Sequence, residues 1–236
     1  MKINLKETFE SLVTQQPGLS LFQFEKYWNW YLEIQLKNHP YSSIHNHFTR
    51  WTRLCSTGMP IAHILGQWGF YKDIFFVNNS TLIPRPETEM MVELALNTIK
   101  KPSHILEIGV GSGAALLSVM LHSSHELNCL GTDISASALQ LCQKNYDAKK
   151  FRLEQHRFTL QLTDRTQGLL KNQYNLILCN PPYIPEHHLG VTKQVQQFEP
   201  ASALYLPKDN YMSWMMELCQ GIIDCLHVGG IAIIEG

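Results

Sequence analysis

The spacing of apolar residues changes along the chain and divides it into three parts. Residues 1–64 carry apolar side chains at helical spacing and lack the alternation of strands. Residues 66–77 alternate aromatic and polar positions around a turn at Lys72-Asp73, which predicts a β-hairpin. From residue 103 onward, strand-like and helix-like runs alternate. We therefore expect a helical domain at 1–64, a hairpin linker at 65–86 and an α/β domain at 87–236.

The alternating part predicts a Rossmann-like parallel sheet covered by helices on both faces. The expected strands are 105–108, 129–132, 158–162, the run ending at Cys179, and 231–234. The expected helices follow Pro84-Arg85-Pro86-Glu87 or begin at Ala114, Ala136 and Tyr211, the last one ending at Leu226. As the last strand, 231–234 is expected to form an exposed edge of the sheet, which lowers stability.

Three polar or glycine-rich segments stand where expected strands end, after Ile108, at Asp133 and at Asn180. The C-terminal ends of parallel strands meet at one edge of a sheet, and ligands of such folds bind there. These three segments are therefore the candidates for a functional site.

The apolar run that ends at Cys179 is followed by Asn180-Pro181-Pro182-Tyr183. Two prolines remove two backbone donors, and a residue that precedes a proline is extended. The carbonyls of Asn180 and of the residues after it can then hold a planar NH2 group, on which Tyr183 can stack. Holding both N–H bonds directs the nitrogen lone pair at an electrophile, so the segment favours alkylation of an amide or nucleobase nitrogen. A strand that ends in a proline turn without a chemical role is the alternative.

A glycine-rich loop, Gly109-Val110-Gly111-Ser112-Gly113, follows the first expected strand and opens a helix. Glycines let the backbone approach a ligand closely, and the helix N-terminus adds partial positive charge. The spacing differs from the Gly-x-Gly-x-x-Gly of NAD sites. Asp133 ends the next strand, where its carboxylate can accept hydrogen bonds from both hydroxyls of a ribose. The loop and the acid together indicate a nucleoside cofactor.

An acceptor for an NH2 group beside an adenosine site indicates S-adenosylmethionine, whose sulfonium activates a methyl group for direct displacement. Asp164, near the end of the expected strand 158–162, is a candidate partner for the adenine amino group. A solvated loop carboxylate is the alternative for Asp164. No strong base is required, so the lack of a catalytic triad does not argue against an enzyme.

Composition narrows the functional classes. The chain has 236 residues, 44% of them apolar, and a formal net charge of −1, which argues against a protein held to nucleic acid mainly by phosphate neutralisation. The N-terminus carries charges where a signal peptide needs an apolar stretch, and no run approaches the length of a membrane span. We expect a cytoplasmic protein.

Cysteines and histidines suggest no further chemistry. The six cysteines form no Cys-x-x-Cys pair and are expected to be buried thiols. The histidine pairs His122 with His125 and His187 with His188 lack the cysteine or carboxylate partners of a closed site, so no metal is expected.

From Pro60 to its last residue, the chain resembles the HemK/PrmC family of peptide chain release factor N(5)-glutamine methyltransferases. Asn-Pro-Pro-Tyr also occurs in adenine methyltransferases, whereas Pro84-Arg-Pro-Glu-Thr-Glu89 is more specific and is similar to the release-factor branch. The blocks that carry the resemblance are 60–66, 82–89, 106–113, 132–135 with Ala138-Leu139, 180–185, and, more weakly, 198–200 with Ala203-Leu204.

The resemblance implies methylation of the glutamine side-chain amide in the Gly-Gly-Gln motif of class 1 peptide chain release factors. It implies a seven-stranded S-adenosylmethionine-dependent methyltransferase domain at 87–236, behind a helical domain at 1–64 that helps to bind the release factor. We expect a monomer that binds class 1 release factors and neither nucleic acid nor a membrane in a stable complex.

The resemblance also implies roles for individual residues. Asn180 and Pro181 would be catalytic, and with Pro182 and Tyr183 they would hold the glutamine amide. Asp133 would hold the ribose of the cofactor, and Asn180 would touch both ligands. The residues implied along the rest of the cofactor are Gly109, Val110, Gly111, Ser112, Gly113, Asp164 and Arg165.

Two features depart from the family pattern. Arg165 stands where the family has an apolar or aromatic contact to adenine, which leaves its role open. The chain ends at Gly236, where the family continues through a further helix and an antiparallel strand pair, so the C-terminal strands of the fold are expected to be missing.

Three other functions stay open. An adenine-N6 methyltransferase for DNA or RNA would use the same acceptor geometry, but the near-neutral charge and the block 84–89 count against it. A truncated, inactive family member is supported by the short C-terminus alone, since all the core motif residues are present. An NAD oxidoreductase needs a third glycine at the Gly-x-Gly-x-x-Gly spacing and a hydride-handling residue, and the sequence shows neither.

Overall fold

The structure is a computed structural model of residues 1–236, and it describes residues 10–12, 20–39, 43–185, 190–206 and 211–236. Contacts divide the chain into two compact units. The first comprises Met1–Gln67 and Val191–Phe198, and the second comprises Trp68–Gly190 and Glu199–Gly236. A short segment far along the sequence therefore belongs to the N-terminal unit, which the sequence pattern did not predict.

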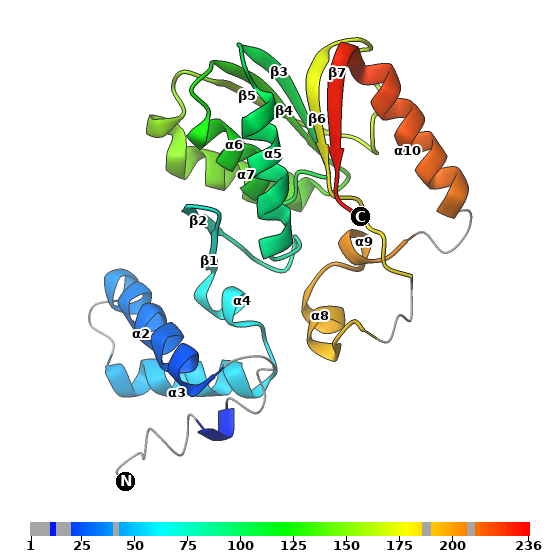
Figure 1. The fold of residues 1–236 in the computed structure, drawn as a ribbon. Helices are drawn as coiled ribbons and strands as arrows, with labels where there is room; N and C mark the ends of the chain where they lie inside the picture. The colour runs from blue at the N-terminus through cyan, green and yellow to red at the C-terminus, as the bar shows by residue number, and fades with distance from the viewer. Residues whose placement is uncertain (1–9, 13–19, 40–42, 186–189, 207–210) are drawn as a thin grey trace. The chain divides into compact units, whose positions relative to one another are not determined.

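The first unit is helical, as expected from its apolar spacing (Figure 1). It contains α2 (Leu21–Asn38), α3 (Ile44–Ser56), α4 (Ile61–Leu65) and α8 (Lys193–Phe198). A capping box of Ser20 and Gln23 starts α2, and the Ser43 hydroxyl caps α3. Aromatic rings of α2 and α3 form the centre of this unit, with Trp28 and Trp51 at 5.9 Å between ring centroids. The dense aromatic residues of this region are thus core residues in large part.

A two-stranded hairpin, β1 (Gln67–Phe70) and β2 (Asp73–Phe76), begins at the boundary between the units. Phe70 and Phe75 are buried in the hydrophobic core of the second unit, so the hairpin is part of that unit's packing. The side chain of Asn145 accepts a hydrogen bond from Phe76 N at 2.7 Å and donates to Phe76 O and to Ser112 O, both at 2.9 Å. One buried amide therefore joins the hairpin to the glycine-rich loop.

The second unit contains a five-stranded parallel sheet in the order β5-β4-β3-β6-β7. Its strands are β3 (Ser103–Ile108), β4 (Leu127–Asp133), β5 (Arg157–Leu162), β6 (Tyr174–Cys179) and β7 (Leu226–Ile234). The chain runs outward from β3 through β4 to β5, then returns to the other side of β3 with β6 and β7. The direction of winding thus switches between β3 and β6, and a crevice opens at such a point beyond the C-terminal ends of the strands.

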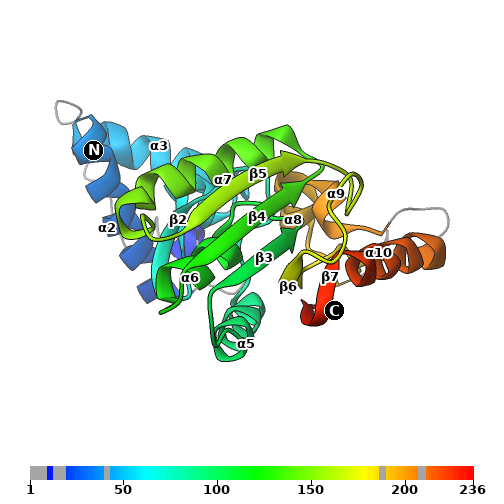
Figure 2. The ribbon, with the colours of Figure 1, turned by 90° about the horizontal axis from the view of Figure 1, so that it is seen from above.

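Helices cover the sheet unequally (Figure 2). One face packs on α5 (Glu89–Thr98), α6 (Ala114–His122) and α7 (Ala136–Lys149), and the opposite face packs on α10 (Tyr211–Cys225) over β3 and β6. At β5 the second face is polar, because Thr159, in register with Leu130, is exposed. The expectation of helices on both faces is therefore met at the centre of the sheet and is wrong at β5. The remaining short elements are η1 (Pro86–Thr88), η2 (Lys150–Arg152) and α9 (Ala201–Leu204).

The last strand is longer than predicted. β7 begins at Leu226, which we had assigned to the end of the helix, instead of at residue 231. Gly229 and Gly230 resemble a turn in the sequence, but here they lie inside the strand beside a register shift between Tyr174 and Leu176. A Cβ on Gly230 would lie 2.9 Å from Tyr174 O, so only glycine fits this irregular pairing.

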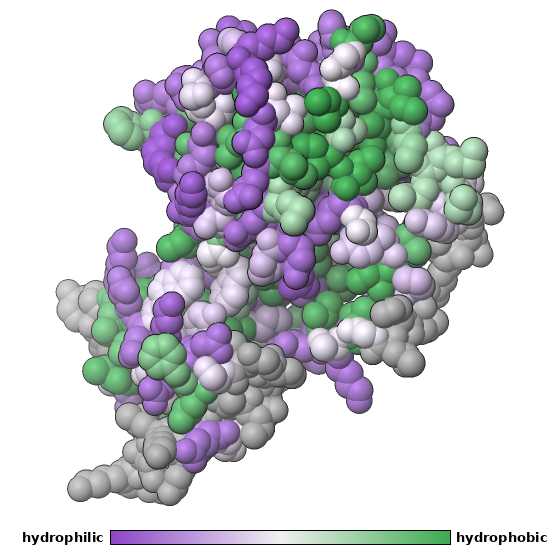
Figure 3. Space-filling view, viewed as in Figure 1, coloured by the Kyte–Doolittle hydropathy of each residue, from purple (hydrophilic) through white to green (hydrophobic). Residues whose placement is uncertain are grey.

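β7 lies at an edge of the sheet, as predicted, and it exposes apolar side chains. Val228 is 87% exposed and Ile231 is 47% exposed. Figure 3 shows apolar surface gathered over β7 and continuing onto α10. Among the helices of the described residues, none is long and apolar enough to cross a membrane.

Candidate functional site

A pocket of about 410 Å³ lies in the second unit at the C-terminal ends of the strands. This volume is typical of sites for small molecules and cofactors. The loops after β3, β4 and β6 all contribute to its lining, as do the segment before α5 and one side of α10. The three segments selected from the sequence therefore meet in one cavity.

The glycine-rich loop forms one wall of the pocket. Gly109 and Gly111 have φ angles of 73° and 54°, a left-handed conformation that strains other residues. A Cβ on Gly109 would meet nothing within 4 Å, so the backbone is open to the cavity at this point. Val110 N donates to Thr132 O at 2.8 Å and fixes the loop to β4. Gly109, Val110, Gly111 and Ser112 all line the pocket.

Gly113 has a different role from the other two glycines of the loop. It does not line the pocket, and a Cβ added to it would lie 2.5 Å from Cys142 Sγ and 3.1 Å from a methyl carbon of Leu117. Its φ angle is 79°. Gly113 therefore allows α6 and α7 to pack closely, whereas the sequence had suggested a ligand contact.

Asp133 lines the pocket at the end of β4 and is held by two backbone donors. Gly111 N donates to Oδ2 and Ser135 N donates to Oδ1, both at 2.9 Å. Each carboxylate oxygen keeps lone pairs for a further donor. The arrangement suits the two hydroxyls of a ribose, because the two backbone N–H groups already fix the orientation of both Asp133 carboxylate oxygens.

Glu107, just before the glycine-rich loop, was not selected from the sequence. Its carboxyl is buried at the base of the pocket, and Leu116 N donates to Oε2 at 3.0 Å. Burial raises the pKa of Glu107 to about 8, the Leu116 hydrogen bond opposes this, and nearby Asp133 adds to it. An acid inside an apolar strand was the signal that could have identified it.

Asn180, Pro181 and Pro182 line the pocket after β6. Asn180 Nδ2 donates to Thr88 Oγ1 at 3.3 Å, which leaves the Asn180 carbonyl oxygen available as an acceptor. Tyr183 is 43% exposed and does not line the pocket. The structure therefore brings together three of the four residues of this segment, without the aromatic ring.

Thr88 belongs to a segment that Glu199 fixes in place. The Glu199 side chain, 1% exposed, accepts a hydrogen bond from Ile83 N at 2.9 Å and pairs with Arg85 Nη2 at 2.7 Å. Thr88 and Arg85 line the pocket. Both sequence blocks, 82–89 and 198–200, had been noted as marks of resemblance, and the structure connects them physically next to Asn180.

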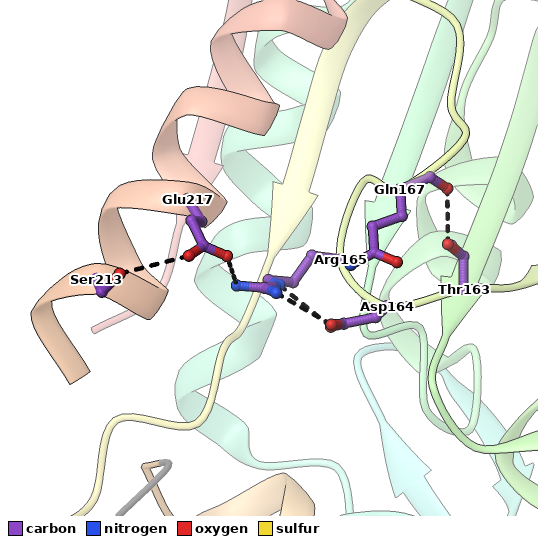
Figure 4. A network of polar contacts seen from close by, with 6 residues as sticks. All are labelled: Thr163, Asp164, Arg165, Gln167, Ser213 and Glu217. Carbon is purple, nitrogen blue, oxygen red and sulfur yellow. Dashed lines mark hydrogen bonds and ion pairs between the residues drawn. The ribbon is translucent and has the colours of Figure 1, made fainter. Parts of the chain in front are cut away.

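Asp164 and Arg165 line the far end of the pocket after β5, together with Trp214 of α10. Figure 4 shows the Arg165 guanidinium lying between Asp164 and Glu217. Arg165 Nε and Nη2 donate to the two Asp164 oxygens at 3.2 and 3.0 Å, and Nη1 donates to Glu217 at 2.8 Å. The carboxylate expected at this end is therefore present and is held by its neighbour in the sequence.

Thr81 is a further lining residue that the sequence did not identify. It is 2% exposed, and its hydroxyl has no hydrogen-bond partner in the described part of the chain. A Cβ on Gly111 would lie 3.9 Å from the Thr81 Cβ, so the hydroxyl stands beside the glycine-rich loop.

The candidate histidines do not form a metal site in the described ranges, which contain no group of three or more potential metal-ligating side chains. His122 pairs instead with Asp73 at 2.9 Å. His187 and His188 lie outside the described residues. The cysteines are free thiols, and all are buried except Cys219, whose exposure contradicts the sequence expectation.

Comparison with known proteins gives one consistent result. The family model described as "Methyltransferase small domain" matches residues 85–210. The chain is 35% identical over 183 residues to a release factor glutamine methyltransferase of Nitratidesulfovibrio vulgaris, covering 76% of this chain and 60% of that relative. It is 33% identical over 204 residues to a release factor glutamine methyltransferase of Buchnera aphidicola, covering 86% of this chain and 70% of that relative.

The chain spans about 60% of the length of the first curated relatives that it matches. Among solved structures, a ribosomal protein L11 methylase from Lactobacillus delbrueckii aligns with a TM-score of 0.44 at 17% identity, covering 65% of this chain and 62% of that one.

Proposed function

The chain belongs to the family of release factor glutamine methyltransferases, and from this premise we propose that it methylates the glutamine side-chain amide in the Gly-Gly-Gln motif of class 1 peptide chain release factors. The fold and the family imply S-adenosylmethionine as the cofactor. The single observation that carries the proposal is the position of Asn180, which lines one pocket together with the glycine-rich loop and Asp133 while its NH2 group donates to Thr88.

The residues of the pocket fit this cofactor. Gly109 to Ser112 would follow its methionine part, where the backbone of the loop is open to the cavity. Asp133 would accept hydrogen bonds from the ribose hydroxyls, and Asp164 from the adenine amino group. When bound, the cofactor supplies a methyl group that its sulfonium makes electrophilic.

Asn180 and Pro181 would act on the acceptor amide. The Asn180 side-chain carbonyl and the Pro181 backbone carbonyl would each accept a hydrogen bond from one N–H group of the glutamine amide. These two hydrogen bonds would orient the lone pair of the amide nitrogen. The same acceptors stabilise the positive charge that develops on the nitrogen as the new bond forms. Pro181 and Pro182 have no N–H groups that could compete for these acceptors.

We assign the binding of the release factor in part to the helical region 1–64, as the family resemblance implies. A cytoplasmic monomer is the form we propose, since release factors act during translation. The packing of α2 against α3 through Trp28 and Trp51 supports this assignment, because it would hold a surface that binds the release factor in a fixed shape.

The proposal is tested with methyl-labelled S-adenosylmethionine and three acceptors: a purified release factor, the same factor with Gly-Gly-Ala in place of Gly-Gly-Gln, and DNA. We expect label in the first acceptor only. Label in DNA alone would identify an adenine methyltransferase instead. Absence of label from every acceptor, with cofactor binding intact, would identify an inactive member of the family.

A further inference from the structure

Arg165 makes a two-pronged contact with the carboxylate next to it. Its Nε and Nη2 atoms donate to the two oxygens of Asp164 at 3.2 and 3.0 Å. Paired N–H···O bonds of this kind fix the plane of a carboxylate as well as its position. The φ angle of Arg165 is 52°, a left-handed conformation that a non-glycine residue keeps only where its surroundings require it.

The same guanidinium reaches across to α10. Nη1 donates to Glu217 at 2.8 Å (Figure 4). The central guanidinium carbon lies 5.6 Å from the centroid of the Trp214 ring. Trp214 lines the pocket, as do Asp164 and Arg165. Arg165 therefore connects the loop after β5 with the side of α10 that forms the pocket wall.

A separate feature brings α10 close to this loop. A Cβ on Gly221 would lie 2.0 Å from the Thr166 hydroxyl oxygen, so a side chain at this position would displace the Thr166 side chain that packs on the helix. Gly221 stands one helical turn after Glu217. The loop and α10 are thus in contact at two successive turns, by close packing and by an ion pair.

We propose that Arg165 is a positioning residue for the adenosine end of the cofactor pocket. Its guanidinium holds both the Asp164 carboxylate and the Trp214 side of α10 in the geometry that binds adenosine. The inference rests on the proposed function, because it assigns adenosine to this end. It gives a role to the residue that departs from the apolar or aromatic pattern of the family.

The two halves of this contact differ in exposure. The Arg165 side chain is 15% exposed, that of Asp164 36%, and that of Glu217 61%. Solvent screens the outer pair with Glu217 more strongly than the inner one. Loss of the guanidinium should therefore affect binding more than loss of the Glu217 charge.

The test is calorimetric binding of S-adenosylhomocysteine and of methylthioadenosine, which contains only the adenosine end, to the full chain and its variants. Arg165→Leu should weaken both ligands by about tenfold, the effect expected when a charge-assisted contact is lost. Arg165→Lys keeps the charge without the two-pronged geometry and should recover only part of the affinity. Glu217→Gln should weaken both ligands by about two- to threefold.

The matched control is Asp224→Asn. Asp224 pairs with Lys171 at 2.8 Å and also connects α10 to a loop, but it does not line the pocket. This variant should bind both ligands like the wild type. Thermal unfolding of every variant reports whether the fold is kept.

The outcomes separate this proposal from the proposed function. If the wild type binds neither ligand, both are overturned. If the wild type binds but Arg165→Leu binds equally well, only the positioning role is overturned. The positioning role is also overturned if Arg165→Leu loses affinity for S-adenosylhomocysteine but not for methylthioadenosine. It is overturned as well if Asp224→Asn loses as much affinity as Arg165→Leu. Neither result would locate the effect at the adenosine end.

Discussion

The two ends of the pocket are held by different physical means. At the acceptor end, Glu199 is almost completely buried and fixes the segment whose Thr88 contacts Asn180. At the adenosine end, Glu217 and Arg165 form an ion pair that is open to water on one side. Salt screens a buried charge pair only slightly, whereas an exposed ion pair is screened by salt and contributes less to stability. The comparison suggests that this pocket is most rigid where the acceptor nitrogen must be aligned.

The strongest test of the acceptor end is Asn180→Ala. Removal of one preorganised acceptor should lower the rate of methyl transfer by about 100-fold or more. Transfer of label to the release factor measures the rate, and thermal unfolding should show that the fold is kept. Full activity in this variant would show that the acceptor amide is held elsewhere.

The centre of the pocket, between the two ends, should respond to pH through Glu107. Its pKa is raised from 4.5 to about 8, so the folded state keeps a proton that the unfolded state loses. Stability from this group is complete below about pH 4.5 and decreases as pH rises to about 8, by a few kcal/mol in all. Glu107→Gln should remove this decrease in urea unfolding measured across that range.

The difference between the wild type and Glu107→Gln isolates the carboxyl. His156, whose pKa is lowered by burial, titrates in both proteins and therefore cancels. Parallel pH profiles for the two proteins would show that Glu107 is ionised in the folded state at neutral pH.

A direct comparison of the two ends uses one substitution at each, Glu199→Gln and Glu217→Gln. The first leaves Arg85 beside a neutral partner in a site whose carboxylate is 1% exposed, and should reduce the free energy of unfolding by about 2 kcal/mol. The second should cost less than about 1 kcal/mol, because Glu217 is 61% exposed. Equal losses in urea unfolding would contradict the contrast between the two ends.

A smaller loss of rate than in Asn180→Ala is expected at Thr88, which contacts Asn180 at 3.3 Å. Thr88→Val keeps the shape but removes the hydroxyl, so kcat should fall by about tenfold while cofactor affinity is unchanged. Thr88→Ser restores a hydroxyl and should restore most of the rate. A failure of serine to restore kcat would assign Thr88 a packing role alone.

The sequence predicted the sheet well because its signals are local. Apolar runs that end in glycine, aspartate or asparagine-proline marked β3, β4 and β6, and the structure places these ends around one pocket. The extent of β7 was not predictable in this way. Gly229 and Gly230 indicate a turn when read locally, and the structure places them in the irregular stretch between Leu226 and Ile231, the residues of β7 that pair with β6 on either side.

Contacts between distant side chains were the other limit. Glu199 and Ile83 are 116 residues apart in sequence, and Asn180 and Thr88 are 92 apart. No periodicity connects such pairs, so their contact depends on how the elements are finally packed. Gly113 illustrates the same limit, since its closeness to Cys142, which requires a glycine, does not show in the sequence.

The hydrogen bonds of Asn145 have a consequence for the order of folding. This side chain joins the hairpin at Phe76, 69 residues away in sequence, to the glycine-rich loop at Ser112, 33 residues away. Contacts between residues so distant in sequence form more slowly than local ones. We therefore expect the glycine-rich loop to reach its final shape only after the hairpin and the helix that contains Asn145 have met.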